Sequence, residues 1–253
     1  MRTCFSTILI IVLIFSCEDE SNINSDKNTF YDDMADITYL NGSFYSTNYD
    51  LSGNSGSQID LLKFEDDGNR IFLADYFDLD MNGQGYLAIT NDSEHLYIQS
   101  KQTELLIKSS SIGEKAFLKY DDVSSSWHPA GLAYNPDNDS LNALYRNGDD
   151  PTQYRLRTIS KDVDGIVSRD KAFRLDFIDN SFHGVYALEY HDNQFYMLGV
   201  DSSHQDVMLR TDYDLNVMEI DTLLDSTVVG LCFKGGDLYL SFRENRIEPW
   251  AKN

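Results

Sequence analysis

The polar residues best placed for chemistry lie in two stretches in the second half of the chain. Trp127-His128 and Phe182-His183 each put an aromatic ring beside an imidazole, and Glu189 follows the second pair inside an apolar run. An aromatic face next to a hydrogen-bonding group suits a sugar or a peptide, and a lone carboxylate can bind a cation or a polar group. These five residues are the predicted ligand-binding residues. The alternatives are ordinary loop packing for the first four and a carboxylate hydrated by channel water for Glu189.

A second candidate site is an acidic turn that resembles a calcium loop in spacing. Asp78, Asp80 and Asn82 alternate along the chain and Gly83 follows them, as in the first half of an EF-hand loop. The twelfth position is Ile89 rather than glutamate, which excludes an EF-hand. The three side chains remain candidate ligands of a looser Ca²⁺ site, with a plain acidic turn as the alternative. Apart from this possible Ca²⁺, we expect no cofactor.

Covalent catalysis has no clear signature in the sequence. There is no Gly-x-Ser-x-Gly motif, no phosphate-binding loop and no His/Cys metal spacing. Cys232 lies inside an apolar run, where a thiol is usually inert packing. The 42 acidic residues make coincidental carboxylate pairs inevitable, so no pair identifies a glycosidase. The sequence therefore predicts no catalytic residue.

The elements that position these residues repeat along the chain. Two short apolar runs joined by turn residues recur five times, and two further runs follow each of the first four pairs. No stretch keeps apolar residues at helical spacing for more than about two turns, so we expect essentially no helix. The second run of each repeat carries a tyrosine, 43–52 residues from the next: Tyr45, Tyr97, Tyr145, Tyr196 and Tyr239.

Four strands in each unit of this length indicate an all-β fold, a β-propeller. Five four-stranded blades fit the count best, six are possible, and an open β-sandwich is the rival architecture. The fifth unit ends one strand short after residues 246–249, and we expect residues 29–31 (Thr-Phe-Tyr) to close the ring as an N-terminal strand. Aligning the first runs places five residues at one position of the innermost strand: Thr38, Ala88, Ala133, Glu189 and Cys232. Glu189 is therefore expected to face the central channel.

One repeat carries a resemblance to known proteins. Residues 130–141 (Ala-Gly-Leu-Ala-Tyr-Asn-Pro-Asp-Asn-Asp-Ser-Leu) resemble the repeat of the extracytoplasmic propeller superfamily with NHL-type, SMP-30-like and phytase-esterase-like members. The resemblance covers the folded body as a repeat pattern and implies the fold rather than an activity. SMP-30-like enzymes hold a divalent cation with a Glu and several Asn or Asp ligands. Only Glu189 stands at a matching kind of position here.

The start of the chain resembles a targeting signal. Arg2 and the apolar residues 8–15 are typical of a signal peptide, which we place at residues 1–16. Ile-Phe-Ser-Cys at residues 14–17 resembles a bacterial lipobox, which implies that Cys17 becomes lipidated. Glu-Asp-Glu at residues 18–20 resembles the export signal of surface lipoproteins in the Bacteroidetes. An ordinary secretory signal peptide is the alternative.

The remaining organisation follows from composition and charge. Residues 17–28 are polar and read as a flexible, lipidated tether, and residues 29–253 as the propeller domain. A net charge of −22 excludes nucleic acid and anionic lipid headgroups as partners, so the membrane is contacted through the lipid anchor only. We expect an outer-membrane protein that faces the cell exterior.

The leading functional hypothesis is a binding module for a glycan, a peptide or an envelope protein, without catalysis. A metal-dependent hydrolase or lactonase, with its site in the channel around Glu189, is the first alternative. A structural subunit of an envelope complex is the second.

Overall fold

The computed structural model describes residues 34–48, 60–78, 86–100, 105–110, 115–119, 126–162, 166–178, 184–225, 227–243 and 245–251. All of these residues belong to one unit, Tyr31–Asn253. Every regular element in them is a β-strand, which confirms the prediction of an all-β chain. This part of the chain contains no helix that is long and apolar enough to span a bilayer.

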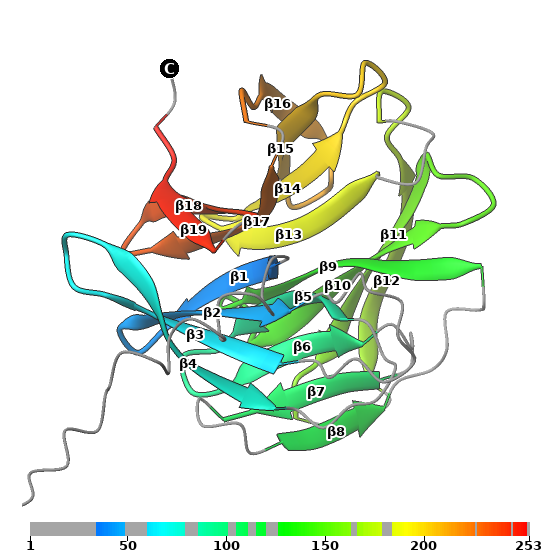
Figure 1. Ribbon diagram of the computed structural model, residues 1–253. Helices are drawn as coiled ribbons and strands as arrows, with labels where there is room; N and C mark the ends of the chain where they lie inside the picture. Colours follow the sequence, from blue (N-terminus) through cyan, green and yellow to red (C-terminus); the bar gives the residue numbers. More distant parts are fainter. Residues whose placement is uncertain are drawn as a thin grey trace, which may run out of the picture. The chain divides into compact units, whose positions relative to one another are not determined.

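The strands form five antiparallel sheets that follow one another along the chain (Figure 1). Blade 1 contains β1 (Met34–Leu40), β2 (Ser43–Asn48), β3 (Asp60–Asp66) and β4 (Ile71–Asp78). Blade 2 contains β5 (Tyr86–Asn91), β6 (Leu96–Ser100), β7 (Leu105–Ser109) and β8 (Lys115–Lys119). Blade 3 contains β9 (Trp127–Asn135), β10 (Ser140–Asn147), β11 (Gln153–Ser160) and β12 (Val167–Arg174). Blade 4 contains β13 (Val185–His191), β14 (Gln194–Val200), β15 (Asp206–Asp212) and β16 (Val217–Thr222). Blade 5 contains β17 (Val228–Lys234), β18 (Asp237–Phe242) and β19 (Arg246–Pro249).

Tight turns join the first two strands of blades 1, 4 and 5. Both central residues of each turn have positive φ: 51° and 89° at Asn41-Gly42, 48° and 60° at Asp192-Asn193, and 62° and 95° at Gly235-Gly236. Two successive positive φ angles are the signature of a type I′ turn, whose twist matches that of the two flanking strands. Asn, Asp and Gly tolerate this conformation best, which is why these residues mark the hairpins in the sequence.

Hydrophobic cores join each blade to the next. The core between blades 5 and 1 combines Ile37 and Phe44 of blade 1 with Cys232 and Ile247 of blade 5. Equivalent cores lie between blades 1 and 2, 2 and 3, 3 and 4, and 4 and 5. The last blade therefore packs on the first, through β17 and β1. The five blades form a closed β-propeller, as predicted, rather than six blades or an open sandwich.

The five inner strands, β1, β5, β9, β13 and β17, converge at the axis of the ring (Figure 1). Each of them contains an irregularity in its pairing with the second strand of its blade. The residue after the irregularity is small in four blades, at Ala88, Gly131, Ala187 and Gly230. A β-bulge of this kind bends the strand and strengthens its twist.

The glycines show how closely the inner strands approach. A Cβ atom added to Gly131 would lie 2.6 Å from Cβ of Leu188 in the next blade. A Cβ atom on Gly230 would lie 2.6 Å from Oδ1 of Asp36 and 2.8 Å from the backbone nitrogen of Ile37. Real Cβ atoms do not come this close to backbone atoms, so only glycine fits without a shift of the strands.

The register corrects part of the predicted alignment. Thr38, Glu189 and Cys232 lie opposite the tyrosines of their second strands, as expected. In blade 2, however, Tyr97 lies opposite Thr90 rather than Ala88. In blade 3, Tyr145 lies opposite Pro129, and Ala133 faces Asn142. The connections between the first two strands span residues 92–95 and 136–139 in these blades, longer than the two-residue turns elsewhere, so the middle of the first run does not face the second-strand tyrosine there.

The expected N-terminal closing strand, residues 29–31, lies outside the residues that the structure describes. Blade 5 has three strands in the described part of the chain, one fewer than the other blades, as the sequence repeat indicated. Closure by a strand from the N-terminal side therefore stays a prediction.

We predict that Gly230→Ala destabilises the fold by about 2 kcal/mol or more, because the new methyl group collides with the backbone of β1. The control is Ala88→Gly, which removes a methyl group at the corresponding point of β5 and should cost only about 1 kcal/mol. Chemical denaturation of the purified proteins measures both effects. A Gly230→Ala protein as stable as the wild type would contradict the close approach of β17 and β1.

Candidate functional site

Asp36 is a buried carboxylate that connects the inner strands at the axis. Its side chain is 1% exposed, and Oδ1 accepts hydrogen bonds from the backbone N–H of Ile37 at 2.9 Å and of Leu231 in β17 at 3.3 Å. Burial raises the pKa of Asp36 well above its ordinary value, against the opposing effect of the N–H groups of Ile37, Leu231 and Ile89. These three donors belong to β1, β17 and β5, so one carboxyl group serves three blades.

Glu189 is the carboxyl group of the axis that remains partly exposed. It lies in β13 opposite Tyr196, and Oε1 accepts one hydrogen bond from the backbone N–H of Tyr190 at 3.2 Å. Burial raises the pKa of Glu189 to about 8, and the hydrogen bond from Tyr190 only partly opposes this shift. Near neutral pH the carboxyl group is therefore mostly protonated and can donate a hydrogen bond.

Cys232 of β17 completes a group of three acidic side chains from blades 1, 4 and 5. Its thiol is buried, and its pKa is raised well above the ordinary value by burial first and then by the charges of Glu189 and Asp36. Glu189 likewise raises the pKa of Asp36. Since like charges disfavour one another's ionisation, the axis favours protonated forms. Glu189 is the one partly exposed member of the three and hence the one that can contact a ligand.

An aromatic wall stands beside Glu189, between blades 4 and 5. His191, two residues after Glu189 on the same side of β13, stacks on Phe233 of β17 with ring centroids 4.0 Å apart and an interplanar angle of 13°. Tyr196, opposite Glu189, meets the same Phe233 edge-on at 5.0 Å. The rings give the carboxyl group a low-polarity surrounding on one side, which agrees with its raised pKa.

The structure does not bring Trp127 and His128 together with Glu189. Trp127 and His128 begin β9, four and three residues before Gly131, and Gly131 packs level with Leu188. At about 3.3 Å per residue, Trp127 lies roughly 15 Å along the strand direction from the level of Glu189. Trp127 instead packs against the core between blades 2 and 3, under Arg155 at 5.9 Å, while His128 is exposed.

Several predicted residues cannot be placed. Phe182, His183, Asp80, Asn82 and Cys17 lie outside the described residues, and Asp78 is described only as the last backbone position of β4. Among the residues that the structure does describe, no three His, Cys, Asp or Glu side chains lie together as metal ligands would.

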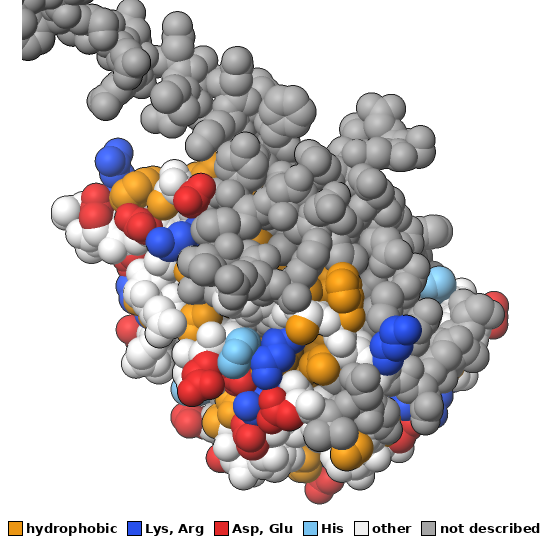
Figure 2. All heavy atoms as spheres, turned by 90° about the horizontal axis from the view of Figure 1, so that it is seen from below, with side chains coloured by type: hydrophobic (Ala, Val, Ile, Leu, Met, Phe, Trp, Pro, Cys, Tyr) orange, Lys and Arg blue, Asp and Glu red, His pale blue; other side chains and the backbone are white. Residues whose placement is uncertain are grey.

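A polar network that the sequence did not predict joins blades 2 and 3. The Asp92 carboxylate accepts hydrogen bonds from the hydroxyl of Tyr97 at 2.8 Å, from Nζ of Lys161 at 2.9 Å and from the backbone N–H of His95 at 2.7 Å. Partial burial opposes ionisation of Asp92, but Lys161, His95 and Tyr97 hold its pKa well below the usual range. Figure 2 shows that acidic and basic side chains lie next to each other elsewhere on the surface too, on the face drawn there. Because its donors and acceptors satisfy one another, we interpret this network as structural.

Asp36 is the axial residue that sequence reasoning missed. It follows Met34 and Ala35 and precedes Ile37, and therefore stands as an acid in an apolar stretch of an inner strand. The same signal identified Glu189. Asp36 stands two residues before Thr38, the predicted inner position of the first run, and this spacing could have revealed it.

We predict that Glu189→Gln stabilises the protein by an amount that grows as the pH rises from about 4.5 to about 8. The unfolded chain has the ordinary pKa of 4.5 and the folded chain a pKa of about 8, so between these values the unfolded state releases a proton that the folded state keeps. Raising the pH through this window therefore destabilises the wild type, and the loss is complete above the folded pKa. The variant cannot ionise, and its free energy of unfolding should exceed the wild-type value by a few kcal/mol at about pH 9 and approach it at about pH 4.5. Urea unfolding across this pH range measures the difference; a difference that does not change with pH would contradict the raised pKa.

The comparisons with known proteins support the fold. No protein family and no curated protein matches the sequence. Among solved structures, the chain is similar to glutaminyl cyclase of Myxococcus xanthus, with a TM-score of 0.57 and 13% identity over 86% of this chain and 91% of that one. It is also similar to a chain of the nidogen/laminin complex, with a TM-score of 0.51 and 12% identity over 83% of this chain and 72% of that one. Virginiamycin B lyase of Staphylococcus aureus follows, with a TM-score of 0.48 and 16% identity over 86% of this chain and 66% of the lyase. At these identities the likeness is to the β-propeller fold, which enzymes and binding proteins share.

Proposed function

We propose that the protein is a binding module of the cell envelope that takes a glycan or a peptide at the axis of its propeller, through Glu189. The observation that carries this proposal is the position of that carboxyl group. The carboxyl group lies on an inner strand and is partly exposed. It accepts a hydrogen bond from the backbone N–H of Tyr190, which leaves capacity for a ligand.

The protonated state of Glu189 defines the ligand chemistry. With a pKa of about 8, the group is a neutral carboxylic acid near neutral pH, with one O–H donor and remaining acceptor capacity. Such a group pairs with a carbonyl or hydroxyl of a neutral ligand. Phe233 and Tyr196 supply apolar surface beside it, which suits the face of a sugar or the side chain of a peptide.

Proton transfer by Glu189 is the second candidate function. A carboxyl group with a pKa near the working pH is suited to general acid–base catalysis. The likeness to a glutaminyl cyclase gives one substrate class to test, peptides with an N-terminal glutamine. This candidate relies on Glu189 as the proton carrier. The metal-dependent hydrolase considered from the sequence has no cluster of ligands in the part of the chain described here.

The anchor is the second part of the proposal. Cys17 would carry the lipid, residues 17–28 would form the tether, and Glu18-Asp19-Glu20 would direct the protein to the outer face of the outer membrane. The support is the short apolar segment that ends in Ser16-Cys17, together with the acidic residues that follow it. A long polar tether would leave the propeller free to meet extracellular glycans or envelope proteins.

We predict that Cys17→Ser abolishes lipidation and releases the protein in soluble form, because one thiol makes the whole attachment. Metabolic labelling with a tagged fatty acid measures lipidation directly. Cys232→Ser is the matched control, since that thiol is buried, and it should leave the label unchanged. Label that persists in Cys17→Ser would refute the anchor.

We predict that ligand binding at the axis falls as the pH rises through about 8, because ionised Glu189 loses its donor. A glycan array and a peptide library screened with the full mature chain provide the probes. Glu189→Gln keeps a donor and should bind with little pH dependence, whereas Glu189→Ala should lose binding. Glu65→Gln, an exposed residue of β3 paired with Lys63, is the control and should behave like the wild type.

Two results would overturn the binding proposal. Wild-type affinity in Glu189→Ala would place the site elsewhere. Turnover of an N-terminal glutaminyl peptide that disappears in Glu189→Gln would favour catalysis, because glutamine cannot exchange a proton as the carboxyl group does.

A further inference from the structure

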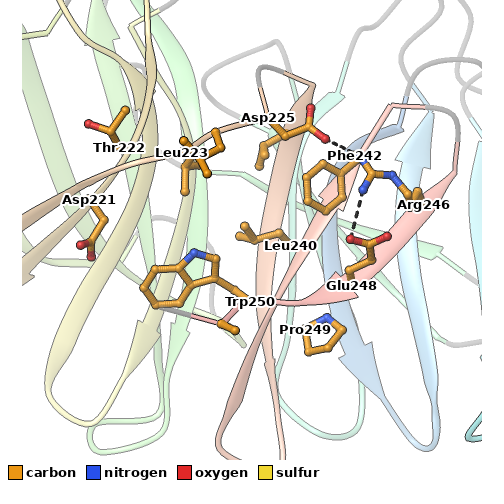
Figure 3. Close-up of a pocket in the computed structure, with 13 residues that line it drawn as sticks. Asp221, Thr222, Leu223, Asp225, Leu240, Phe242, Arg246, Glu248, Pro249 and Trp250 are labelled. Atoms are coloured by element: carbon orange, nitrogen blue, oxygen red, sulfur yellow. Dashed lines mark hydrogen bonds and ion pairs between the residues drawn. The ribbon is translucent and has the colours of Figure 1, made fainter. Parts of the chain in front are cut away.

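A second candidate site lies between blades 4 and 5, and neither Glu189 nor Asp36 lines it. A cavity of about 380 Å³ opens there. The end of β16 and the segment after it, Asp221–Asp225, form one wall (Figure 3). The rest of the lining includes Val228 of β17, Leu240 and Phe242 of β18, and Arg246, Glu248 and Trp250 at and beyond β19. We call this space the blade 4–5 cavity.

Trp250 provides an aromatic surface in the blade 4–5 cavity. Its backbone N–H donates a hydrogen bond to the carbonyl of Leu238 at 2.8 Å, which fixes the chain just after β19. The indole ring is partly buried against the core between blades 4 and 5, and it projects toward Leu223 and Asp221 across the space (Figure 3). One side of the cavity is thus a tryptophan with carboxylate and apolar groups facing it.

Arg246 is held in place on the other side of the cavity. Its Nη2 donates to Oδ2 of Asp225 at 2.5 Å, and its Nη1 lies 3.0 Å from Oε2 of Glu248. The guanidinium group also stacks over the ring of Phe242, with Cζ 3.8 Å from the ring centroid. Two carboxylates and an aromatic face leave the guanidinium little freedom, so the polar groups of the cavity are preorganised.

The charges of the cavity decide which ligand fits. Asp221, Asp225 and Glu248 bring three carboxylates against the single guanidinium of Arg246, so an anionic ligand would be repelled. A purely apolar ligand would cover these charged groups without offering them hydrogen bonds, which is costly. A neutral ligand with hydroxyl groups around an apolar ring face satisfies both the charged groups and Trp250. The volume lies at the small end of ligand sites, room for one or two sugar rings.

We propose that the blade 4–5 cavity binds a neutral carbohydrate, with one ring stacked on Trp250 and its hydroxyl groups bonded to the Asp225–Arg246–Glu248 cluster. This site is independent of Glu189, so the axial site and the sugar site can succeed or fail separately.

The two tryptophans of the chain, Trp127 and Trp250, allow a direct test. Trp127→Phe leaves Trp250 as the only indole, and its emission is then titrated with neutral monosaccharides and disaccharides, among them glucose, galactose, mannose, N-acetylglucosamine and cellobiose. We expect a saturable shift or quenching with at least one sugar, and none with glucuronate. Trp250→Phe leaves Trp127, packed between blades 2 and 3, as the matched control, and it should give no response.

Two further variants connect the signal to the cavity. Arg246→Ala, made in the Trp127→Phe protein, should weaken sugar binding at least ten-fold, while Glu65→Gln in the same background, at an exposed residue outside both sites, should leave it unchanged. A melting curve of each variant shows that it is folded; should Arg246→Ala unfold, Glu248→Gln takes its place with the same expectation. The proposal is overturned if no sugar of the panel changes Trp250 emission at its highest soluble concentration. It is equally overturned if Trp250→Phe responds as strongly as Trp127→Phe.

Discussion

The convergence of five backbones at the axis is the constraint on which this propeller depends. Successive inner strands approach so closely that Gly131 meets Leu188, and Gly230 meets Asp36, without room for a methyl group. Water cannot enter such contacts, so a polar group placed among them must find its partners in the protein. Asp36 meets this demand at Oδ1, which accepts hydrogen bonds from backbone N–H groups of β1 and β17, while its buried Oδ2 has no hydrogen-bond partner among the described residues. The close packing of the inner strands therefore also determines the electrostatics of the axis, because it buries the Asp36 carboxyl group.

A comparison of the inner strands from blade to blade shows why Glu189 is unusual. Opposite the tyrosine of the second strand, Thr38 accepts a hydrogen bond from Nδ2 of Asn91 at 2.6 Å, and Thr90 accepts one from the N–H of Tyr134 at 3.1 Å. In blades 1 and 2 this position thus carries a hydroxyl that bonds to the next blade. Blade 4 places a carboxyl group there, which bonds within its own strand. A departure from a repeated structural arrangement, at a cost in desolvation, is expected where a protein has a function to serve.

Much of the fold could be predicted from the sequence, because a weak strand or turn pattern becomes convincing when it recurs in five repeats. Turn residues such as Asn41-Gly42 and the recurring tyrosines predicted the strands, the blade count and the inner position of Glu189. The register in blades 2 and 3 could not be predicted, because an alignment of the first runs does not show how a longer turn, such as the one between Thr90 and Tyr97, sets the pairing. Asp36 was overlooked since its role arises from N–H groups of other blades. The blade 4–5 cavity could not be foreseen either, because Trp250 and Asp221 come together only through the packing of two blades.

The hydrogen bond between Asp36 and Leu231 also constrains the last step of folding. Its two residues are 195 positions apart, so the bond joins the first blade to the last. In any form of the chain in which blade 5 is not docked, Asp36 lacks the N–H of Leu231 and the cover of Gly230. Hydration then favours the ionised carboxylate, and a charge at a strand edge disfavours pairing with another chain. The carboxyl group becomes fully buried only when blade 5 docks, so its desolvation and the closure of the ring are one event.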